Sequence, residues 1–230
     1  TLTSEPYMAW VVIPEGLRKE EIADILADKL GWTDAQKTEW IMKDTATSSN
    51  YFEGVYFPDT YLIPKDEPTA QVAQRLQAKF QEKFAPYAAE ELKQNIRGPT
   101  LIRVASLIQR EAGSKDDMPV IAGVLWNRLL QGMNLDIDAT LQYARGDKVM
   151  GWWAPISIAD KKINSLYNTY LNKGLPPHPI ANPGLDAIKA ALYPSETGCL
   201  YYLHDSSKVL HCAKTYEEHQ QNILKYYSKN

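Results

Sequence analysis

Apolar residues recur every three or four positions in several stretches of the chain, which is the spacing of one buried face of an α-helix. These runs predict helices at 69–84, about 99–112, about 119–131, 185–192 and from 215 onwards. In the second helix Val104 and Ile108 belong to the apolar row, and Glu111 stands where that row continues. A carboxylate on the core-facing side of a helix is costly to bury unless it is paired or stays protonated. Glu111 is therefore the first candidate for a chemical role.

Shorter patterns predict strands near both ends of the chain. Residues 10–13 predict a strand, and the apolar positions after the following turn predict a helix that buries Ile22, Ile25, Leu26 and Leu30. Thr33 with Gln36 has the pattern of a capping box for a second helix. Residues 200–203 and 209–212, separated by turn residues, predict a hairpin. The polar run TATSSN at 45–50 predicts a domain boundary.

Helices and short strands follow no regular alternation, so we expect an α+β fold. The stretch from about Leu135 to Gly184 has no strong period, and a connection of that length is uncommon unless it serves a function or is disordered. Its aromatic residues and prolines favour a long ordered loop region.

Composition narrows the class of protein. At 230 residues, with 44% hydrophobic and 23% charged residues, the chain is typical of a soluble globular protein. A net charge of −3 without a basic cluster argues against a nucleic-acid partner. Six Trp and 14 Tyr suit a sugar-binding cleft, although such rings also fill ordinary cores.

Two cysteines flank the predicted hairpin. Cys199 and Cys212 would lie nearly opposite each other across a tight hairpin, so a disulfide and two free thiols are both compatible with the pattern. No CxxC pair and no Cys/His cluster of ligand spacing occurs in the sequence, and we expect neither a metal nor an organic cofactor.

No stretch of the sequence approaches the roughly 18 consecutive apolar residues of a membrane span. The chain starts without an initiator Met, and we expect it to be an excised soluble portion of a protein whose anchor lies outside this chain.

Four ordered motifs resemble those of one family. VASLIQREAG is followed by IAGVLWNRL, and the other three are FEGVYFPDTY (52–61), MNLDIDATLQYARG (133–146) and YNTYLNKGLPPHPIANPG (167–184). Together with the closing KTYEEH, they resemble the endolytic murein transglycosylases, the MltG or YceG-like family, over roughly residues 8–228. The resemblance implies a small LysM-like subdomain at 1–47 and a mixed α+β catalytic domain at 48–230.

The resemblance also implies a chemistry for Glu111. As an acid, Glu111 would protonate the glycosidic oxygen of the β-1,4 bond between N-acetylmuramic acid and N-acetylglucosamine. As a base, it would then accept the proton of the muramyl C6 hydroxyl, which closes on C1 to leave a 1,6-anhydro end. Where many relatives carry two acidic residues, this chain has Gln109 and Arg110 before Glu111, which leaves one acid.

The other motifs supply predicted contacts with the glycan. The predicted substrate-binding residues are Glu53, Asn127, Arg128, Thr140, Gln142, Tyr167, Asn168, Thr169 and Tyr170. Asp136 stands where Gln is common in the family and His178 where Gly is common, so we expect these two positions to alter contacts with the substrate.

The resemblance further implies peptidoglycan strands as substrate and cell-wall synthesis proteins as partners. It places the protein on the outer side of the bacterial cytoplasmic membrane, held by a single-pass anchor. Two alternatives stay open: a glycoside hydrolase that uses Glu53 or Asp138 as a second carboxylate, and a wall-binding or scaffold module without turnover.

Overall fold

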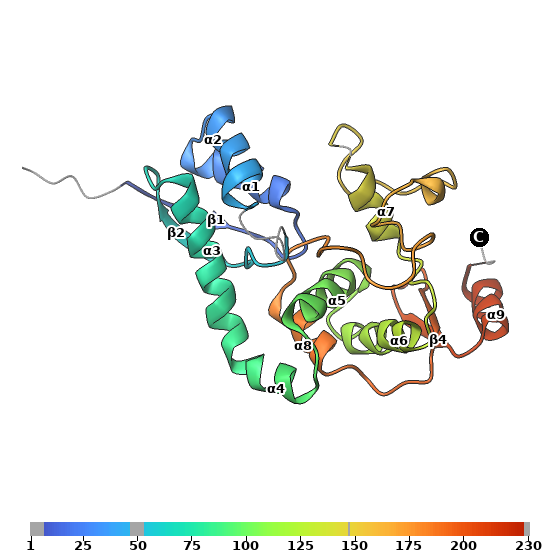
Figure 1. Ribbon diagram of the computed structural model, residues 1–230. Coiled ribbons are helices and arrows are strands. Elements are labelled where there is room, and N and C mark those ends of the chain that lie inside the picture. Colours follow the sequence, from blue (N-terminus) through green and yellow to red (C-terminus); the bar gives the residue numbers. More distant parts are fainter. Residues whose placement is uncertain (1–6, 47–52, 147, 228–230) are drawn as a thin grey trace, which may run out of the picture. The chain divides into compact units, whose positions relative to one another are not determined.

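The computed structural model describes residues 7–46, 53–146 and 148–227, which belong to two compact units (Figure 1). The first unit takes Thr1–Pro99 and His178–Leu185, and the second takes Thr100–Pro177 and Asp186–Asn230. The boundary predicted between residues 47 and 48 lies outside the described residues. Neither unit ends at that point, because β1 pairs with a strand that follows it.

The first unit combines a two-stranded sheet with helices. Its elements are β1 (Met8–Val12), α1 (Lys19–Leu30), α2 (Asp34–Glu39), the π-helical turn η1 (Trp40–Asp44), β2 (Thr60–Pro64), α3 (Thr69–Phe84), the 3₁₀ turn η2 (Ala85–Tyr87) and α4 (Ala88–Lys93). β1 and β2 are antiparallel, with Trp10 opposite Leu62. The predicted helix at 69–84 is confirmed.

Local sequence explains how these elements begin and end. α1 stops at Gly31, whose φ of 73° lies in the left-handed region that glycine adopts without strain. The predicted capping box is confirmed, because Thr33 Oγ1 accepts from Gln36 N and the Gln36 side chain accepts from Thr33 N. Helices α1 and α2 lie between the two strands in sequence. That residues 1–47 form a LysM-like subdomain stays a prediction.

A late segment of the chain completes the first unit. Asn182 is fully buried there, and its Oδ1 accepts hydrogen bonds from the backbone N–H groups of Gly54 and Tyr56, each at 2.9 Å. Its Nδ2 donates to Glu53 Oε1 at 2.7 Å and to the Leu17 carbonyl at 3.0 Å. One amide therefore satisfies backbone and side-chain groups from two separate stretches of the unit.

The second unit is built from helices and a hairpin. Its elements are α5 (Gly98–Glu111), α6 (Met118–Leu130), α7 (Asp138–Arg145), the 3₁₀ turn η3 (Asp160–Lys162), α8 (Leu185–Leu192), β3 (Tyr201–His204), β4 (Leu210–Ala213) and α9 (Tyr216–Tyr227). The predicted helices and the hairpin are confirmed. The stretch 135–184 is not all loop, because it contains α7 and η3.

The path of the chain into β3 is set by α6. The backbone N–H of Ser195 donates to the Pro119 carbonyl at 2.9 Å, and Asn127 Nδ2 donates to the Thr197 carbonyl at 2.7 Å. Gly123 lies between Pro119 and Asn127 in the sequence of α6, and a Cβ at this position would stand 2.4 Å from the Ser195 carbonyl oxygen. Only glycine allows the segment to run this close to the helix.

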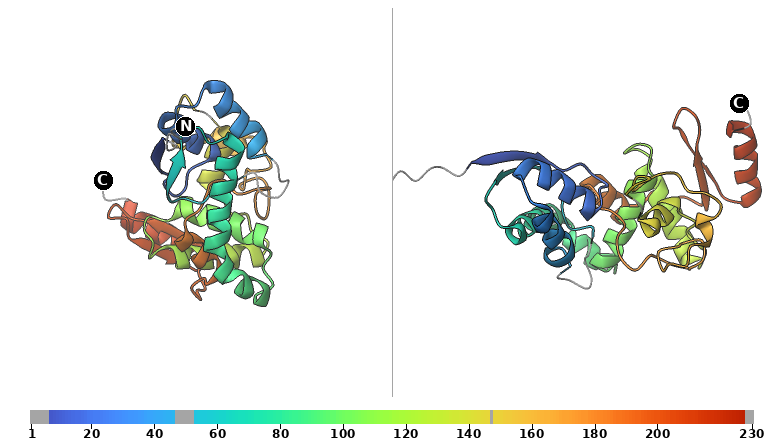
Figure 2. Two further views of the ribbon diagram at one scale, coloured as in Figure 1. Left: turned by 90° about the vertical axis from the view of Figure 1, so that its left-hand side faces the viewer. Right: turned by 90° about the horizontal axis from the view of Figure 1, so that it is seen from above.

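The hairpin is closed by a disulfide between Cys199 and Cys212, whose Cα atoms are 5.8 Å apart. Of the two states compatible with the sequence, the structure has the disulfide. Tyr202 lies opposite Cys212 in the β3–β4 register. The hairpin and α9 lie side by side in the views of Figures 1 and 2.

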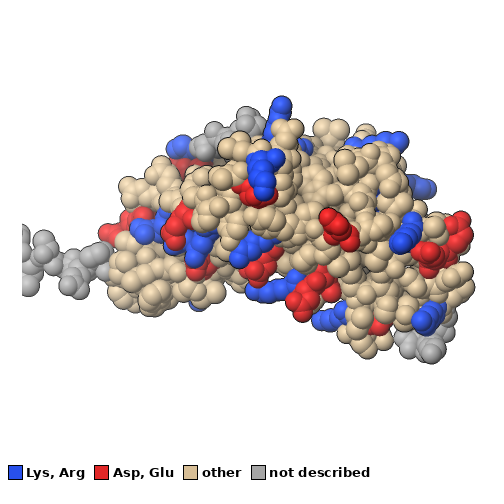
Figure 3. All heavy atoms as spheres, turned by 90° about the horizontal axis from the view of Figure 1, so that it is seen from below, with Lys and Arg blue, Asp and Glu red and all other residues tan. Residues whose placement is uncertain are grey.

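Mixed helices and two small sheets confirm the α+β class. Within the described ranges, no helix is long and apolar enough to cross a membrane. Figure 3 shows one face of the molecule, on which acidic and basic side chains are interspersed.

Candidate active site

Helix α5 carries Glu111 into a cleft. The apolar row of this helix is fully buried, as Val104 and Ile108 show, and Glu111 ends the helix in a half-buried position. The cleft beside Glu111 lies within the second unit and has a volume of about 860 Å³. Glu111 thus continues the buried apolar face of α5, and its carboxyl group reaches the cleft, which a ligand can enter.

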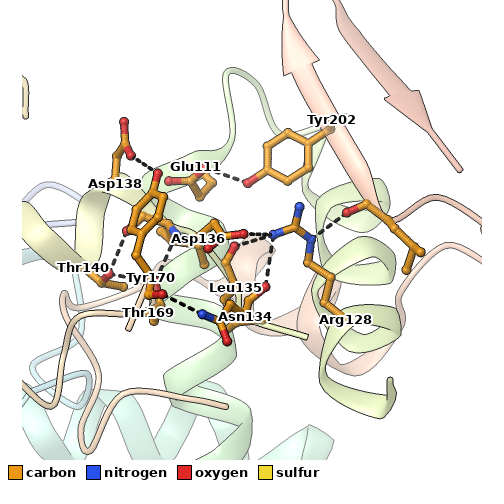
Figure 4. Close-up of polar contacts among 12 residues, drawn as sticks. Glu111, Arg128, Asn134, Leu135, Asp136, Asp138, Thr140, Thr169, Tyr170 and Tyr202 are labelled. Carbon is orange, nitrogen blue, oxygen red and sulfur yellow. Dashed lines mark hydrogen bonds and ion pairs between the residues drawn. The ribbon is translucent and has the colours of Figure 1, made fainter. Parts of the chain in front are cut away.

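The surroundings of Glu111 favour its protonated form. Burial raises the pKa of Glu111, and the negative charge of Asp138 adds to the shift. Tyr202 Oη donates a 2.6 Å hydrogen bond to Glu111 Oε2, which opposes part of the rise (Figure 4). Glu111 therefore holds its proton to a higher pH than an exposed glutamate does, while one oxygen is fixed in direction.

A second carboxylate lines the cleft from α7. Tyr170 Oη donates to Asp138 Oδ1 at 2.5 Å (Figure 4). Lys161 Nζ lies 4.4 Å from the centre of the Tyr170 ring. Burial and the contact with Asp138 raise the pKa of the Tyr170 hydroxyl. Tyr170 therefore stays a neutral donor that orients Asp138.

Arg128 joins two stretches that line the cleft. Its side chain is buried and donates to the carbonyls of Leu200, at 2.6 Å, and Leu135, at 2.8 Å. Its Nη1 also forms an ion pair with Asp136 Oδ2 at 3.3 Å (Figure 4). The backbone φ of Asp136 is 54°. Arg128 thus holds the start of the hairpin against the loop that leads into α7.

Three predicted substrate-binding residues are buried between residues 135 and 184: Thr140 within α7, and Asn168 and Thr169 in the segment between η3 and α8. Thr140 and Thr169 are buried and share a hydrogen bond of 3.0 Å between their Oγ1 atoms. Asn168 is buried and donates to the carbonyls of Lys161 and Ile163. Their polar groups bond to the protein itself, so they hold α7, which carries Asp138, against the segment that carries Tyr170.

Three others also bond within the protein and do not line the cleft. Asn127 donates to the carbonyls of Thr197 and Cys199, and Gln142 donates to those of Trp153 and Ala154. The Tyr167 ring lies 4.8 Å from that of Tyr143. Of the predicted substrate-binding residues, Arg128 and Tyr170 line the cleft. Contact of the others with substrate stays a prediction.

Glu53 belongs to the first unit, where it is fully buried. Its Oε1 accepts from the Lys19 backbone N–H and from Asn182 Nδ2, both at 2.7 Å. Burial raises its pKa from an ordinary value of 4.5 to about 8, and the charge of Glu20 adds to the shift. These contacts make Glu53 part of the interior of the first unit.

This raised pKa predicts a pH-dependent stability. Between pH 4.5 and about 8, folded Glu53 keeps a proton that the unfolded chain has released. The stabilisation from the neutral form is on the order of 5 kcal/mol; it is complete below pH 4.5 and is lost as the pH rises through 8. Glu53→Gln should remove this loss, because the amide oxygen accepts the same two hydrogen bonds without a charge.

Urea unfolding at pH 5 and pH 9 measures the effect. The variant should gain stability over the wild type at pH 9, and Glu196→Gln at an exposed position should not. An equal stability difference between wild type and Glu53→Gln at both pH values would contradict the prediction.

Sequence reasoning missed Tyr202. It lies 91 positions from Glu111, and only the folding of the hairpin brings the two together. Sequence reasoning also missed the lining residues of the hairpin and α9, among them Tyr201 and Tyr216. The one sequence signal for these residues was the excess of Tyr over Phe in the composition, which does not indicate particular positions. The described residues contain no group of three or more His, Cys, Asp or Glu that could hold a metal ion.

Comparisons with known proteins agree with one another. The model of the YceG-like family matches residues 1–225. A Bacillus subtilis protein named endolytic murein transglycosylase is 32% identical, over 96% of this chain and 66% of its own length. A Streptococcus pneumoniae protein of the same name is 27% identical, over 96% of this chain and 45% of its own length. This chain therefore spans only part of these relatives.

A solved structure shares the fold. The crystal structure of a yceG-like protein from Listeria monocytogenes, at 2.6 Å, superposes with a TM-score of 0.82 and 30% identity. The match covers 93% of this chain and 76% of the other. Because the family model extends over nearly the whole sequence, the chain belongs to the YceG-like family.

Proposed function

We propose that this chain is the catalytic part of an endolytic lytic transglycosylase. It cleaves the β-1,4 bond between N-acetylmuramic acid and N-acetylglucosamine within nascent glycan strands. The proposal is supported by the names of the B. subtilis and S. pneumoniae relatives. The observation that carries it is the half-buried carboxyl group of Glu111, which has a raised pKa and is held by Tyr202 in a large cleft.

The first step uses Glu111 as an acid. Protonated Glu111 gives its proton to the glycosidic oxygen, and the bond from that oxygen to the muramyl C1 breaks as positive charge develops at C1. A pKa raised by burial keeps the proton on Glu111 to a higher pH than on an exposed glutamate, which suits a general acid.

The second step uses the same group as a base. The Glu111 carboxylate accepts the proton of the muramyl C6 hydroxyl, whose oxygen bonds to C1. The ring closure gives a 1,6-anhydro end and returns Glu111 to its protonated form, so no water is consumed. Asp138 in the cleft wall carries a negative charge that favours the cationic character at C1.

Asp138 also supports a second candidate function, a two-carboxylate glycoside hydrolase. Such an enzyme needs a second carboxylate near the scissile bond, and Asp138 lines the same cleft as Glu111. Glu53 is a weaker candidate for this role, because its carboxylate is buried in the first unit by Lys19 and Asn182.

Product analysis distinguishes these functions. Purified uncrosslinked peptidoglycan strands are incubated with the protein, and the fragments are analysed by mass spectrometry. Internal fragments ending in 1,6-anhydro-muramic acid support the proposal. Reducing ends heavier by one water would indicate the hydrolase, and intact strands would favour a wall-binding module.

Action on the wall implies a site outside the cytoplasmic membrane, which we propose together with an anchor outside this chain. The disulfide between Cys199 and Cys212 supports this site, because disulfides persist in oxidising compartments. Cell-wall synthesis proteins are the further partners that this site suggests.

Tyr202→Phe tests how the hydrogen bond tunes the acid. Loss of the hydroxyl removes the contact that lowers the pKa of Glu111, so that pKa should rise. Activity falls when Glu111 loses its proton, so the alkaline limb of the pH profile of kcat/KM should move to higher pH. At the optimum we expect a loss of roughly ten-fold, because one oxygen of Glu111 is no longer fixed.

The profile is measured with wild type, Tyr202→Phe and the control Tyr193→Phe, at an exposed tyrosine outside the cleft. If Tyr202→Phe lost activity but the alkaline limb of its pH profile stayed where it is in the wild type, Tyr202 would have a packing role only.

A further inference from the structure

The face of α9 that lines the cleft has no role in the chemistry above. Tyr216, His219, Ile223 and Tyr227 are spaced along one side of this helix, and all four line the same cleft as Glu111. No residue of α9 is buried, and the side chain of Tyr216 is 54% exposed. In a folded protein the apolar side of a helix is ordinarily covered by other elements. The side of α9 that faces the cleft stays exposed, so it is available to a ligand.

Aromatic rings form a wall at this place. The Tyr201 ring of β3 is stacked on His219 at 5.3 Å between centroids and lies 5.9 Å from Tyr216. Among the described residues, the buried Nδ1 of His219 has no hydrogen-bond partner. Burial and the charge of Arg128 lower the pKa of His219, so its ring is neutral near pH 7. The wall thus combines the aromatic rings of two tyrosines with a neutral imidazole.

The wall is continuous with the candidate active site. The Arg128 guanidinium lies 5.1 Å from the centre of the Tyr201 ring and pairs with Asp136, which also lines the cleft. The 860 Å³ of this cleft is at the upper end of the ~300–1,000 Å³ of ligand pockets, so it has room beyond the atoms that react.

We propose that Tyr201, Tyr216 and His219 form a sugar subsite that holds a further N-acetylhexosamine of the strand, next to the pair cleaved at Glu111. The inference rests on the proposed function for the identity of the sugar. A pyranose has an apolar face that stacks on aromatic rings, and hydroxyl and acetamide groups that need hydrogen bonds. Continuity with the cleft favours the strand itself over an unrelated partner.

The test measures binding without turnover. Uncrosslinked glycan strands of defined length are titrated calorimetrically into the full chain carrying Glu111→Gln. Adding Tyr216→Ala should weaken binding of long strands about ten-fold and leave binding of the shortest oligosaccharide unchanged. Tyr216→Phe keeps the ring and should bind like the parent. Tyr193→Ala is the matched control, because its side chain is 50% exposed and lies outside the cleft.

Equal binding of long strands with and without the Tyr216 ring would overturn the subsite. An equal loss in Tyr193→Ala, or no binding of strands by the parent, would overturn it as well. Because the readout needs no catalysis, its failure is separate from that of the proposed function. Wild-type protein that gives no anhydro fragments, together with weakened binding in Tyr216→Ala, would leave the subsite in place and remove the reaction.

Discussion

Replacing Glu111 by glutamine should end the release of anhydro fragments, with a loss of rate of about 100- to 10,000-fold. The amide has nearly the same shape, and its oxygen still accepts the hydrogen bond from Tyr202. It can neither give a proton to the glycosidic oxygen nor take one from the C6 hydroxyl. Both proposed steps therefore fail in the variant, although the packing of α5 is unchanged. Initial rates are measured by mass spectrometry of the fragments.

The matched control for this variant is Glu196→Gln, in the same unit but exposed and outside the cleft. It should keep the wild-type rate, and circular dichroism should show both variants folded. If Glu111→Gln kept a rate within a few-fold of wild type, another group would be the acid. Asp138 would then be the next residue to replace, because it is the other α-helical carboxylate in the cleft wall.

Asn182→Ala should destabilise the first unit by roughly 3–5 kcal/mol, because each buried polar group left without a partner costs about 1–3 kcal/mol. The change removes the acceptor of the Gly54 and Tyr56 N–H groups. It also removes a donor to Glu53, whose carboxyl stays buried. No side chain of alanine's size can replace these contacts.

Hydrogen exchange at single residues measures this effect within the first unit. The N–H groups of Gly54 and Tyr56 should lose protection first, and urea unfolding should give the total loss. Asn172→Ala is the control, because that half-buried amide donates only to the Ser165 and Asn168 carbonyls, and its loss should cost about 1 kcal/mol. A change at Asn182 no larger than at Asn172 would contradict the prediction.

The core helices were predicted from their apolar rows, whereas α2, which buries no residue, was predicted from its capping box. The run through Val72, Leu76 and Phe80 predicted α3, and all three side chains are buried. Helix α7 was missed because its two buried apolar residues, Ala139 and Leu141, are too few to establish a period, whereas α8, of the same length, buries five. Its sequence also follows a stretch without regular pattern, so the whole region was predicted as loop.

The site shows a different limit. Glu111 could be predicted because it interrupts a local pattern, whereas Tyr202 depends on the fold of a distant hairpin. Asn168 and Thr169, whose contact with the glycan stays a prediction, bond to the Ile163 carbonyl and the Ile137 N–H of the same region. A long ordered loop must pair its own backbone groups, and the sequence cannot distinguish this need from binding.

The eighteen-residue motif at 167–184 contributes to both compact units, with Tyr170 in the cleft of one and Asn182 in the interior of the other. During synthesis on a ribosome, the first 99 residues emerge well before Asn182. The N–H groups of Gly54 and Tyr56 therefore cannot form their hydrogen bonds to Asn182 Oδ1 until that residue has been synthesised. The first unit can therefore reach its final state only after α5, α6 and α7 have been synthesised. A fragment truncated after residue 99 would lack His178–Leu185, which belong to the first unit. The two units therefore cannot be expressed separately by dividing the gene at one position.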